Sequence, residues 1–498
     1  MNVVVIGSGF GGLAAAIRLQ AKGFSVRIVE KRDKPGGRAY VYEQDGFVFD
    51  GGPTIITAPW LIHELFELAG RKTSDYVDLV PLDPFYNVRF EDGSVFRYNG
   101  KHDDVVEQIR QFSPEDVAGY ERFYARTEPI FTTGFALIDQ PFSHLTDMVK
   151  MLPDLIRLRS DRSVAQLVNS YISDHRLRQV FSFHPLLVGG DPFRTTSIYT
   201  LIHRLEQEWG VWFAMGGTGA LVNALVKLFI DIGGKIDYDA EVDEILVHER
   251  SDHNKPKARG VRLANGTVIE ADVVVSNGDV AQTYRRLIPE RYRRHNTDAR
   301  IDSWSYSMSL FVIYFGTDKT YENMAHHEIL MGPRYRDLIK DIFTRKVLPD
   351  DFSLYLHRPT ATDPSLAPSG CDAWYVLSPV PHLDADVDWS TMAQVYRDKI
   401  IRYLEERYMP ELSKHIVTEL HIDPLHFRDV LNSYKGSAFS VEPTLLQSAW
   451  WRPHNTSEDV EGLYFTGAGT HPGAGLPGVM SSGAIVARSI AEDVSRPR

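Results

Sequence analysis

Apolar positions at the start of the chain follow the order strand, helix, strand. Val3–Ile6 is a continuous apolar run, as expected for a strand buried on both faces of a parallel sheet. The small and apolar positions of 13–19 predict the helix that follows, and Val26–Val29 predicts a second buried strand. The chain therefore opens on a βαβ unit, whose second strand ends at Glu30.

Similar patterns return in the middle and near the end of the chain. Residues 233–249 and 260–279 alternate as strands, and the second segment turns at Asn265-Gly266. Leu463–Phe465 is an apolar strand, and a helix of small residues follows it. We expect these segments to join the sheet that the opening unit begins.

Composition and charge narrow the class of partners. Of the 498 residues, 43% are hydrophobic and 24% charged, which is ordinary for a globular protein, and the formal net charge is −12. That balance argues against nucleic acid, whose phosphates need a positive surface. The single cysteine, Cys371, excludes an intramolecular disulfide. We expect neither a membrane-spanning helix nor a secretory signal, because no long apolar run occurs and the first strand starts at residue 2.

Glycines fill the turn of the opening unit. Gly7, Gly9 and Gly12 have the GxGxxG spacing, which combines a tight turn, close approach of the backbone to a pyrophosphate, and close packing of helix on strand. The free N–H groups of the helix start then face the phosphates. Glu30 can accept hydrogen bonds from a ribose diol. The turn predicts a dinucleotide site but does not separate NAD from FAD.

Two further glycine-rich segments favour FAD. Gly36-Gly37-Arg38 follows the second strand and resembles the GG-R extension of FAD-dependent amine oxidases and carotenoid desaturases. That resemblance implies that Arg38 pairs with a phosphate or with the flavin. Near the end of the chain, glycines are dense from Gly467 to Gly478, ahead of the small-residue helix. Such density indicates that backbone approaches a ligand closely.

These segments predict an α/β fold with two domains, as the length of the chain also suggests. The first is a discontinuous Rossmann-type FAD-binding domain of the amine-oxidase type, assembled from 1–75, 211–284 and 436–498. The second is a mixed α+β domain for substrate binding and membrane association. It comprises the aromatic-rich insertions 76–210 and 285–435.

Longer stretches resemble one family. They are RDKPGGRAYVYEQDGFVFDGGPT, FSFHPLLVGGDPFRTTSIYTLIHRLEQEWGVWFAMGGTGALV, YKGSAFSVEPTLLQSAWWRPHN and GAGTHPGAGLPGVM. Over essentially the whole chain they resemble the bacterial and fungal phytoene desaturases. The resemblance implies FAD-dependent desaturation of phytoene in carotenoid biosynthesis, with hydride passing to the flavin, a proton leaving the adjacent carbon, and neurosporene or lycopene as product. The alternatives are another carotenoid desaturase or isomerase, or a flavin amine oxidase.

The motifs and the resemblance together predict the cofactor-binding residues. Amine oxidases commonly attach FAD through a cysteine, but Cys371 is far in sequence from the glycine-rich C-terminal loop, so we expect non-covalent FAD. The predicted residues are Gly7, Gly9, Gly11, Gly12, Glu30, Lys31, Gly37, Arg38, Gly52, Pro53, Thr54, Val242, Asn277, Gly467, Gly469, Gly478 and Val479.

A polyene hydrocarbon must be recognised by apolar surface rather than by hydrogen bonds. One stretch supplies a candidate tunnel wall: Ile198, Tyr199, Leu201, Ile202, Trp209, Val211, Trp212 and Phe213.

Candidate acid–base groups are few. His471 lies in the loop expected beside the flavin, and Asp147 and Lys150 lie one helical turn apart. We expect no metal site, because the pair His326-His327 lacks a ligand spacing. The same is true of His421 and His426.

A substrate that dissolves in lipid must be collected from a membrane. Residues 131–163 combine apolar faces with basic side chains, as interfacial segments do, and Met148, Met151 and Leu155 are the expected contact positions. The basic residues are Lys150, Arg157, Arg159 and Arg162. We therefore expect a cytoplasmic protein that is attached peripherally to the inner face of the cell membrane.

The electron acceptor is inferred from the lack of a second dinucleotide turn. The other candidate dinucleotide turn, 215–220, follows an aromatic stretch rather than a β-branched strand and lacks a suitably placed acidic residue. We interpret it as the crossover back into the flavin domain. Oxygen or a membrane quinone, rather than NAD(P), is the expected acceptor.

Overall fold

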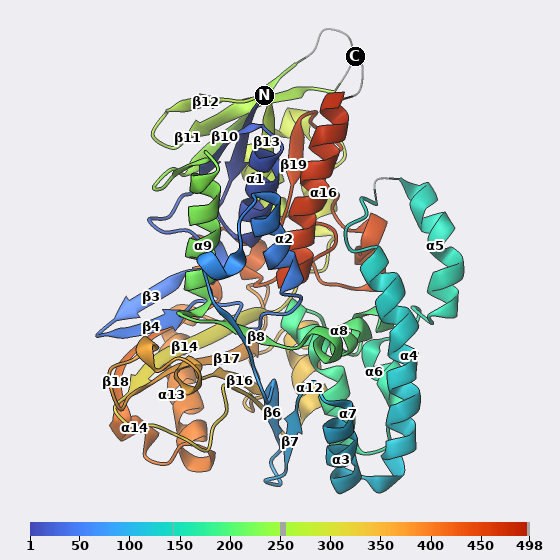
Figure 1. Ribbon diagram of the computed structural model, residues 1–498, viewed down its shortest axis with the longest axis vertical. Helices are drawn as coiled ribbons and strands as arrows, with labels where there is room; N and C mark the ends of the chain where they lie inside the picture. Colours follow the sequence, from blue (N-terminus) through green and yellow to red (C-terminus); the bar gives the residue numbers. More distant parts are fainter. Residues whose placement is uncertain (143, 250–254, 496–498) are drawn as a thin grey trace.

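A five-stranded parallel sheet lies at the centre of one half of the computed structural model, which describes residues 1–142, 144–249 and 255–495 (Figure 1). Its strands in order are β19 (Leu463–Phe465), β13 (Val273–Ser276), β1 (Asn2–Ile6), β2 (Ser25–Val29) and β9 (Lys235–Asp237). Val3 and Val5 point into one hydrophobic cluster and Val4 into another, so the sheet is buried on both faces. The α/β prediction for these segments is confirmed.

Helices cover one face of this sheet, and a small antiparallel sheet covers the other. The helices are α1 (Phe10–Ala21), α2 (Trp60–Leu68), α9 (Gly217–Asp231) and α16 (Leu476–Ser495). The small sheet consists of β10 (Val242–His248), β11 (Lys257–Leu263) and β12 (Val268–Glu270). The first and last helices pack closely, since a Cβ on Gly483 would lie 2.8 Å from the backbone nitrogen of Ala15. Both ends of the chain thus build one layer.

A seven-stranded sheet organises the other half of the molecule. Its order is β18 (Ile416–Ile422), β14 (Ser309–Thr317), β17 (Asp372–Val380), β16 (Leu354–His357), β15 (His327–Leu330), β6 (Tyr86–Arg89) and β7 (Val95–Tyr98). All neighbours are antiparallel except β15 and β6. Helix α13 (Trp389–Arg407) packs on one face, and the largest hydrophobic cluster lies on the other. The strands come from both predicted insertions, although the exact domain boundaries remain a prediction.

Helices flank the larger cluster on its outer side. Helix α5 (Leu145–Arg157) lies at the outer edge of the molecule, beside α4 (Val117–Ala136) (Figure 1). The remaining helices are α3 (His102–Phe112), α6 (Val164–Asn169), α7 (His175–Ser182), α8 (Leu201–Trp209), α10 (Val280–Gln282), α11 (Asp298–Asp302), α12 (Tyr335–Lys340), α14 (Leu412–His415) and α15 (Pro424–Asp429). Two short antiparallel sheets complete the fold: the hairpin of β3 (Val41–Gln44) with β4 (Phe47–Asp50), and the pair of β5 (Leu79–Pro81) with β8 (Trp212–Ala214), which are distant in sequence.

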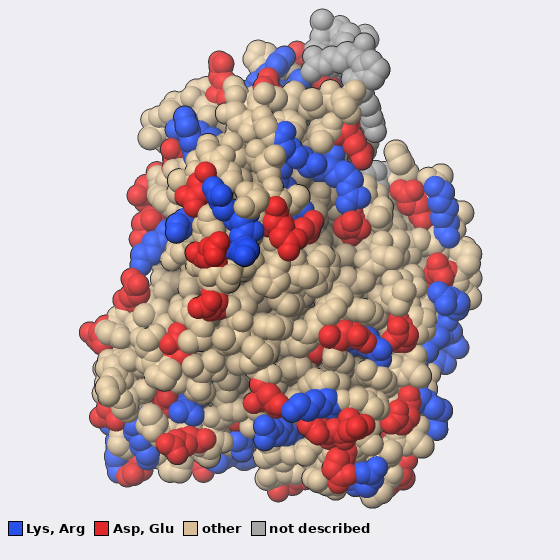
Figure 2. Space-filling model, viewed as in Figure 1, with Lys and Arg blue, Asp and Glu red and all other residues tan. Residues whose placement is uncertain are grey.

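Charges of both signs are interspersed on the surface. On the face shown in Figure 2 they concentrate at the top, the bottom and the edges, and a band across the middle carries few of them. Among the described residues, no helix is both long and apolar enough to span a bilayer.

Candidate active site

One cavity connects the two halves of the molecule. Its volume is about 620 Å³, within the usual range for ligand sites. We call the part beside the β1–α1 turn the polar end; it is lined by Gly9, Gly11, Glu30, Arg38 and Gly467, among others. We call the opposite part the apolar end; its wall includes Leu187, Ile202, Leu205, Met331 and Leu354.

The glycine turn at the polar end is built as its spacing predicts. Gly7 has φ of +91°, a conformation that side chains rarely adopt. A Cβ on Gly12 would lie 2.2 Å from the carbonyl oxygen of Gly7, so only glycine lets α1 approach the strand this closely. Gly9 and Gly11 line the cavity, whereas Gly12 does not. Gly12 therefore supports the site through packing.

Glu30 is fixed at the end of β2. Its carboxylate accepts hydrogen bonds from the Ser8 backbone N–H (2.9 Å) and hydroxyl (2.7 Å), and from the Arg32 N–H (3.0 Å). The side chain is buried and lines the cavity. A carboxylate held in this way is oriented before a ribose arrives.

Arg38 offers a cation to the same end of the cavity. It donates to the Ser433 hydroxyl (2.8 Å), but its Nε has no partner in the described part of the chain. Burial lowers the pKa of Arg38, although Asp279 nearby opposes that shift. Burial also raises the pKa of the Asp279 carboxyl. A desolvated guanidinium with donors to spare is suited to a phosphate.

The C-terminal glycine loop closes the polar end. Arg452, which is buried, holds the loop by donating to the carbonyl oxygens of Thr470 (3.0 Å) and Ala468 (2.7 Å). Sequence reasoning missed Arg452, and its place in the stretch AWWRPHN gave no signal of this role. Gly467 has φ of +107° and faces Asn277. The loop and the β13 end therefore form one wall.

The cavity gathers nearly all the predicted cofactor-binding residues. Gly12 is the exception. Those in the wall are Gly7, Gly9, Gly11, Glu30, Lys31, Gly37, Arg38, Gly52, Pro53, Thr54, Val242, Asn277, Gly467, Gly469, Gly478 and Val479. Cys371 is not among the lining residues.

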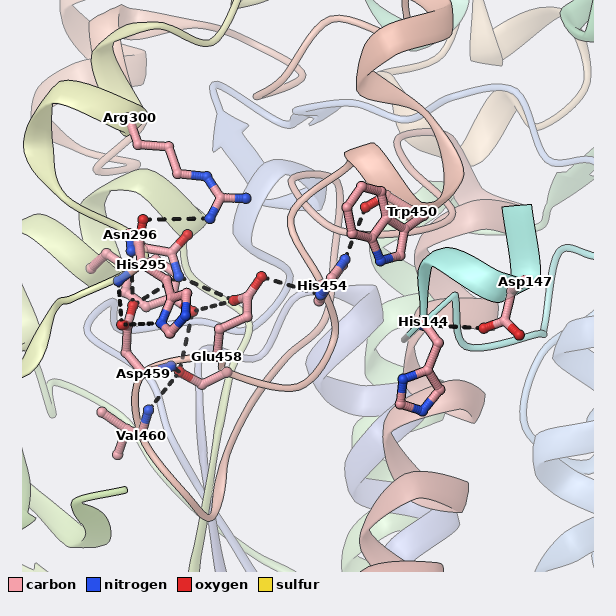
Figure 3. Close-up of polar contacts among 12 residues, drawn as sticks. His144, Asp147, His295, Asn296, Arg300, Trp450, His454, Glu458, Asp459 and Val460 are labelled. Carbon is pink, nitrogen blue, oxygen red and sulfur yellow. Dashed lines mark hydrogen bonds and ion pairs between the residues drawn. The ribbon is translucent and has the colours of Figure 1, made fainter. Parts of the chain in front are cut away.

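The predicted acid–base candidates are separated. His471 lines the cavity, and burial lowers the pKa of its imidazole to about 3, so the ring is neutral at physiological pH. Asp147 and Lys150 are not in the cavity wall. Asp147 accepts a hydrogen bond from the His144 N–H at the start of α5 (Figure 3), and Lys150 is 79% exposed. On the cavity side of this helix the acidic residue is Asp154.

The apolar end uses only part of the predicted tunnel wall. Ile198, Tyr199, Leu201 and Ile202 line the cavity. The other four positions do not: Trp209, Val211, Trp212 and Phe213. Val211 and Phe213 belong to the main hydrophobic cluster instead, because the chain leaves α8 at Gly210 and turns into β8. Most of the wall comes from other elements, including strands β14, β15, β16 and β17.

A buried carboxylate faces the apolar end. Glu206 on α8 is fully buried, lines the cavity, and accepts a hydrogen bond from the Tyr86 hydroxyl (2.6 Å). His184 Nε2 lies 3.2 Å from its other oxygen. Burial, and after it the Glu206 carboxylate, raises the pKa of Tyr86 well above its usual value. Sequence reasoning did not single out Glu206, and no local motif marks it as part of a site.

Helix α5 separates the cavity from solvent. Met148, Met151 and Leu155 line the cavity, so the expectation that they form the outer apolar contact is wrong. The opposite face carries another apolar stripe, Leu145, Val149, Leu152 and Ile156, whose exposures are 54%, 64%, 53% and 65%. Packing over the cavity explains the apolar inner face, whereas a face exposed to solvent is usually polar, so the outer stripe is unusual for a surface helix.

Comparison with known proteins agrees with this geometry. The family of flavin containing amine oxidoreductases matches residues 10–491. The chain is 51% identical to the lycopene-forming phytoene desaturase of Pseudescherichia vulneris, over 99% of each protein. It is 46% identical to the neurosporene-forming phytoene desaturase of Rhodobacter capsulatus, over 100% of this chain and 95% of that protein. In fold it is similar to cyclohexylamine oxidase from Brevibacterium oxydans, with a TM-score of 0.62 at 17% identity over 99% of each chain.

Proposed function

Because the chain belongs to the flavin containing amine oxidoreductases, and among them to the phytoene desaturases, we propose that it is an FAD-dependent desaturase of phytoene. The observation that carries the proposal is the continuous cavity, whose polar end fits a dinucleotide and whose apolar end fits a polyene. Its product is neurosporene or lycopene, since relatives that form each are similar to the chain over nearly its whole length.

The polar end fits FAD without a covalent bond. When FAD is bound, Gly9 and Gly11 would lie beside its pyrophosphate at the start of α1, Glu30 would accept hydrogen bonds from the ribose, and the buried Nε of Arg38 would be available to an anion. FAD, when bound, supplies the acceptor for the hydride that phytoene loses.

The protein then has to position the hydrocarbon and exclude water. Aliphatic walls bind phytoene without hydrogen bonds, and α5 shields the cavity from solvent. His471 is neutral and lines the cavity, so its imidazole can take the proton from the carbon next to the hydride donor. Glu206 is the second candidate for this proton.

Incubation of the flavin-loaded protein with phytoene in liposomes tests the function. We expect coloured products with fewer hydrogens, resolved by chromatography and mass spectrometry. An isomerase would give products of unchanged mass, and an amine oxidase would release hydrogen peroxide from amines and leave phytoene intact. Either result would overturn the proposal.

We further propose that the exposed stripe of α5 attaches the protein to the cytoplasmic face of the membrane. Support comes from its four exposed aliphatic side chains, which lie on the outer face of the helix that covers the cavity, so that phytoene could enter beside them. The variant Val149→Glu/Ile156→Glu should lose most liposome binding. The control Val395→Glu/Val417→Glu changes residues of similar exposure elsewhere and should bind fully. Full binding by both variants would refute this anchor.

Oxygen or a membrane quinone is proposed as the final electron acceptor. The 215–220 turn is unsuited to a second dinucleotide, because the Asp50 carboxylate already accepts from the N–H groups of Thr218 (2.9 Å) and Gly219 (3.1 Å) at the start of α9. Its strand β8 pairs antiparallel with β5, outside the parallel sheet. Sustained anaerobic turnover with NAD(P)+ as sole oxidant would contradict this assignment.

A further inference from the structure

Three histidines meet in the seven-stranded sheet. His327 begins β15 and His357 ends β16, and the two are directly paired across the antiparallel strands. Cross-strand partners carry their side chains on the same face. His326 precedes the first of them, and the ring centroids of the three lie 4.5–5.1 Å apart. Sequence spacing could not bring this set together, because His357 joins the pair only through strand pairing.

Two of the rings are oriented by hydroxyl groups at their Nδ1 atoms. His326 Nδ1 lies 2.6 Å from the Thr362 hydroxyl, and His327 Nδ1 lies 2.8 Å from the Tyr355 hydroxyl. If each Nδ1 carries the proton and donates it, each Nε2 presents a lone pair. This is how second-shell hydrogen bonds orient metal-binding histidines.

The remaining ring nitrogens of the three histidines have no protein partner within the described ranges. They are Nε2 of His326, Nε2 of His327 and both ring nitrogens of His357. The residues are 6%, 0% and 1% exposed. Buried polar atoms in native proteins nearly always have a partner, so this convergence indicates a ligand.

One carboxylate adds to the electrostatic setting of the cluster. The Asp50 carboxylate lies 3.9 Å from His357 Nε2 and supplies a negative charge beside the cluster.

We propose that His326, His327 and His357 bind one divalent transition-metal ion of the zinc type, with water or Asp50 at the fourth position. One candidate ligand atom from each residue lies within 4.8 Å of the others. Nitrogens in a tetrahedral zinc site are about 3.3 Å apart, so small ring movements complete the coordination. Three imidazoles suit zinc and its first-row neighbours rather than magnesium or calcium.

The site would tie the seven-stranded sheet to the cavity wall. The Tyr355 hydroxyl that lies against His327 is also 2.6 Å from the Thr54 hydroxyl, and both residues line the cavity. The metal has no place in the redox steps, and its role is to hold this wall in position.

Metal binding to the untagged, flavin-loaded full chain tests the proposal. After removal of metal with a chelator, titration with Co²⁺ should give one equivalent per chain and the intense visible absorption of four-coordinate cobalt, and Zn²⁺ should displace it. His357→Gln should weaken binding at least tenfold. His421→Gln alters a histidine that stacks on Phe311 outside the cluster and should leave the titration unchanged.

Thr362→Val keeps all three ligands and removes only the partner of His326, so affinity should fall by about 10–100-fold. Wild-type protein that binds no stoichiometric metal overturns the proposal, as does binding that His357→Gln leaves unchanged. Should the histidine variant fail to fold, X-ray absorption on the wild-type zinc form decides. Three imidazole nitrogens at about 2.0–2.1 Å support the site, and any other ligand set refutes it.

Discussion

The two ends of the cavity are built in different ways. The polar end is formed by backbone atoms and a few charged side chains that are fixed in place. Most of these groups come from the closely spaced segments Gly7–Gly12, Glu30 and Gly36–Arg38. At the apolar end, side chains converge from α5, α8 and several strands of the seven-stranded sheet. The first design depends on local geometry that tolerates little change. The second depends on the summed area and shape of the wall, to which each residue contributes little.

The largest effect is therefore expected for the glycine turn. In Gly12→Ala the added Cβ would meet the Gly7 carbonyl at 2.2 Å, and relief requires that α1 move away from β1. Overpacking of this kind costs about 1–3 kcal/mol or more, so FAD affinity should fall by about 100-fold. Fluorescence titration of the apoprotein measures it. Gly23→Ala strains a left-handed glycine (φ +89°) outside the cavity wall, so it controls for a general loss of stability, and equal losses of FAD affinity in the two variants would contradict the account.

Glu30→Ala should have a smaller effect at the same end. It removes charge-assisted hydrogen bonds to the ribose worth about 1.5–3 kcal/mol, so the FAD dissociation constant should rise by at least about tenfold. Ser8→Ala keeps the carboxylate and loses only one of the bonds that orient it, and should change affinity less. An unchanged dissociation constant in Glu30→Ala would remove Glu30 from the site.

At the apolar end, substitution should separate turnover from cofactor affinity. Ile202→Trp adds volume to the cavity wall, and phytoene turnover should drop by about tenfold while FAD affinity stays the same. Trp212→Phe alters a residue outside the wall and should turn over phytoene normally. Equal losses in the two variants would mean that the wall is wrongly assigned.

The smallest effect concerns the loop that carries His454 and Glu458, which do not line the cavity. His454 Nδ1 lies 3.1 Å from Glu458 Oε1, and His454 Nε2 hydrogen-bonds to the carbonyl oxygen of Trp450 (Figure 3). Despite burial, its partners raise the pKa of His454, and they lower that of Glu458 to about 2. Glu458 contributes to the free energy of unfolding above about pH 4.5, and His454 contributes to it below about pH 6.5. The pair therefore stabilises the folded state most between these two values.

His454→Gln should accordingly lower the free energy of unfolding by about 1 kcal/mol more at pH 5.5 than at pH 8.5. Urea unfolding at the two pH values measures the difference. His175→Gln, an exposed histidine elsewhere, should show none. A His454→Gln deficit that is the same at both values would show that the ion pair does not contribute.

The same contrast explains what the sequence could predict. The polar end could be predicted from Gly7, Gly9 and Glu30, because these residues lie within one short stretch. The turn requires the glycines, and Glu30 stands at the end of the strand that follows. Trp212 was misplaced because a turn at Gly210, not hydrophobicity, decides which aromatic residues reach the cavity. The faces of α5 were exchanged because Met148 and Val149 are equally apolar, and only packing shows which one is inside. Glu206 and His357 acquire their partners through long-range contacts that no local pattern records.

The central claim is that phytoene in the apolar end reduces FAD held at the polar end. The direct measurement is the visible spectrum of the flavin-loaded protein mixed anaerobically with phytoene liposomes. The account predicts bleaching of the oxidised flavin in step with formation of the first desaturated product, and recovery when oxygen or a quinone is added. A flavin that stays oxidised in the presence of liposome-bound phytoene would contradict it.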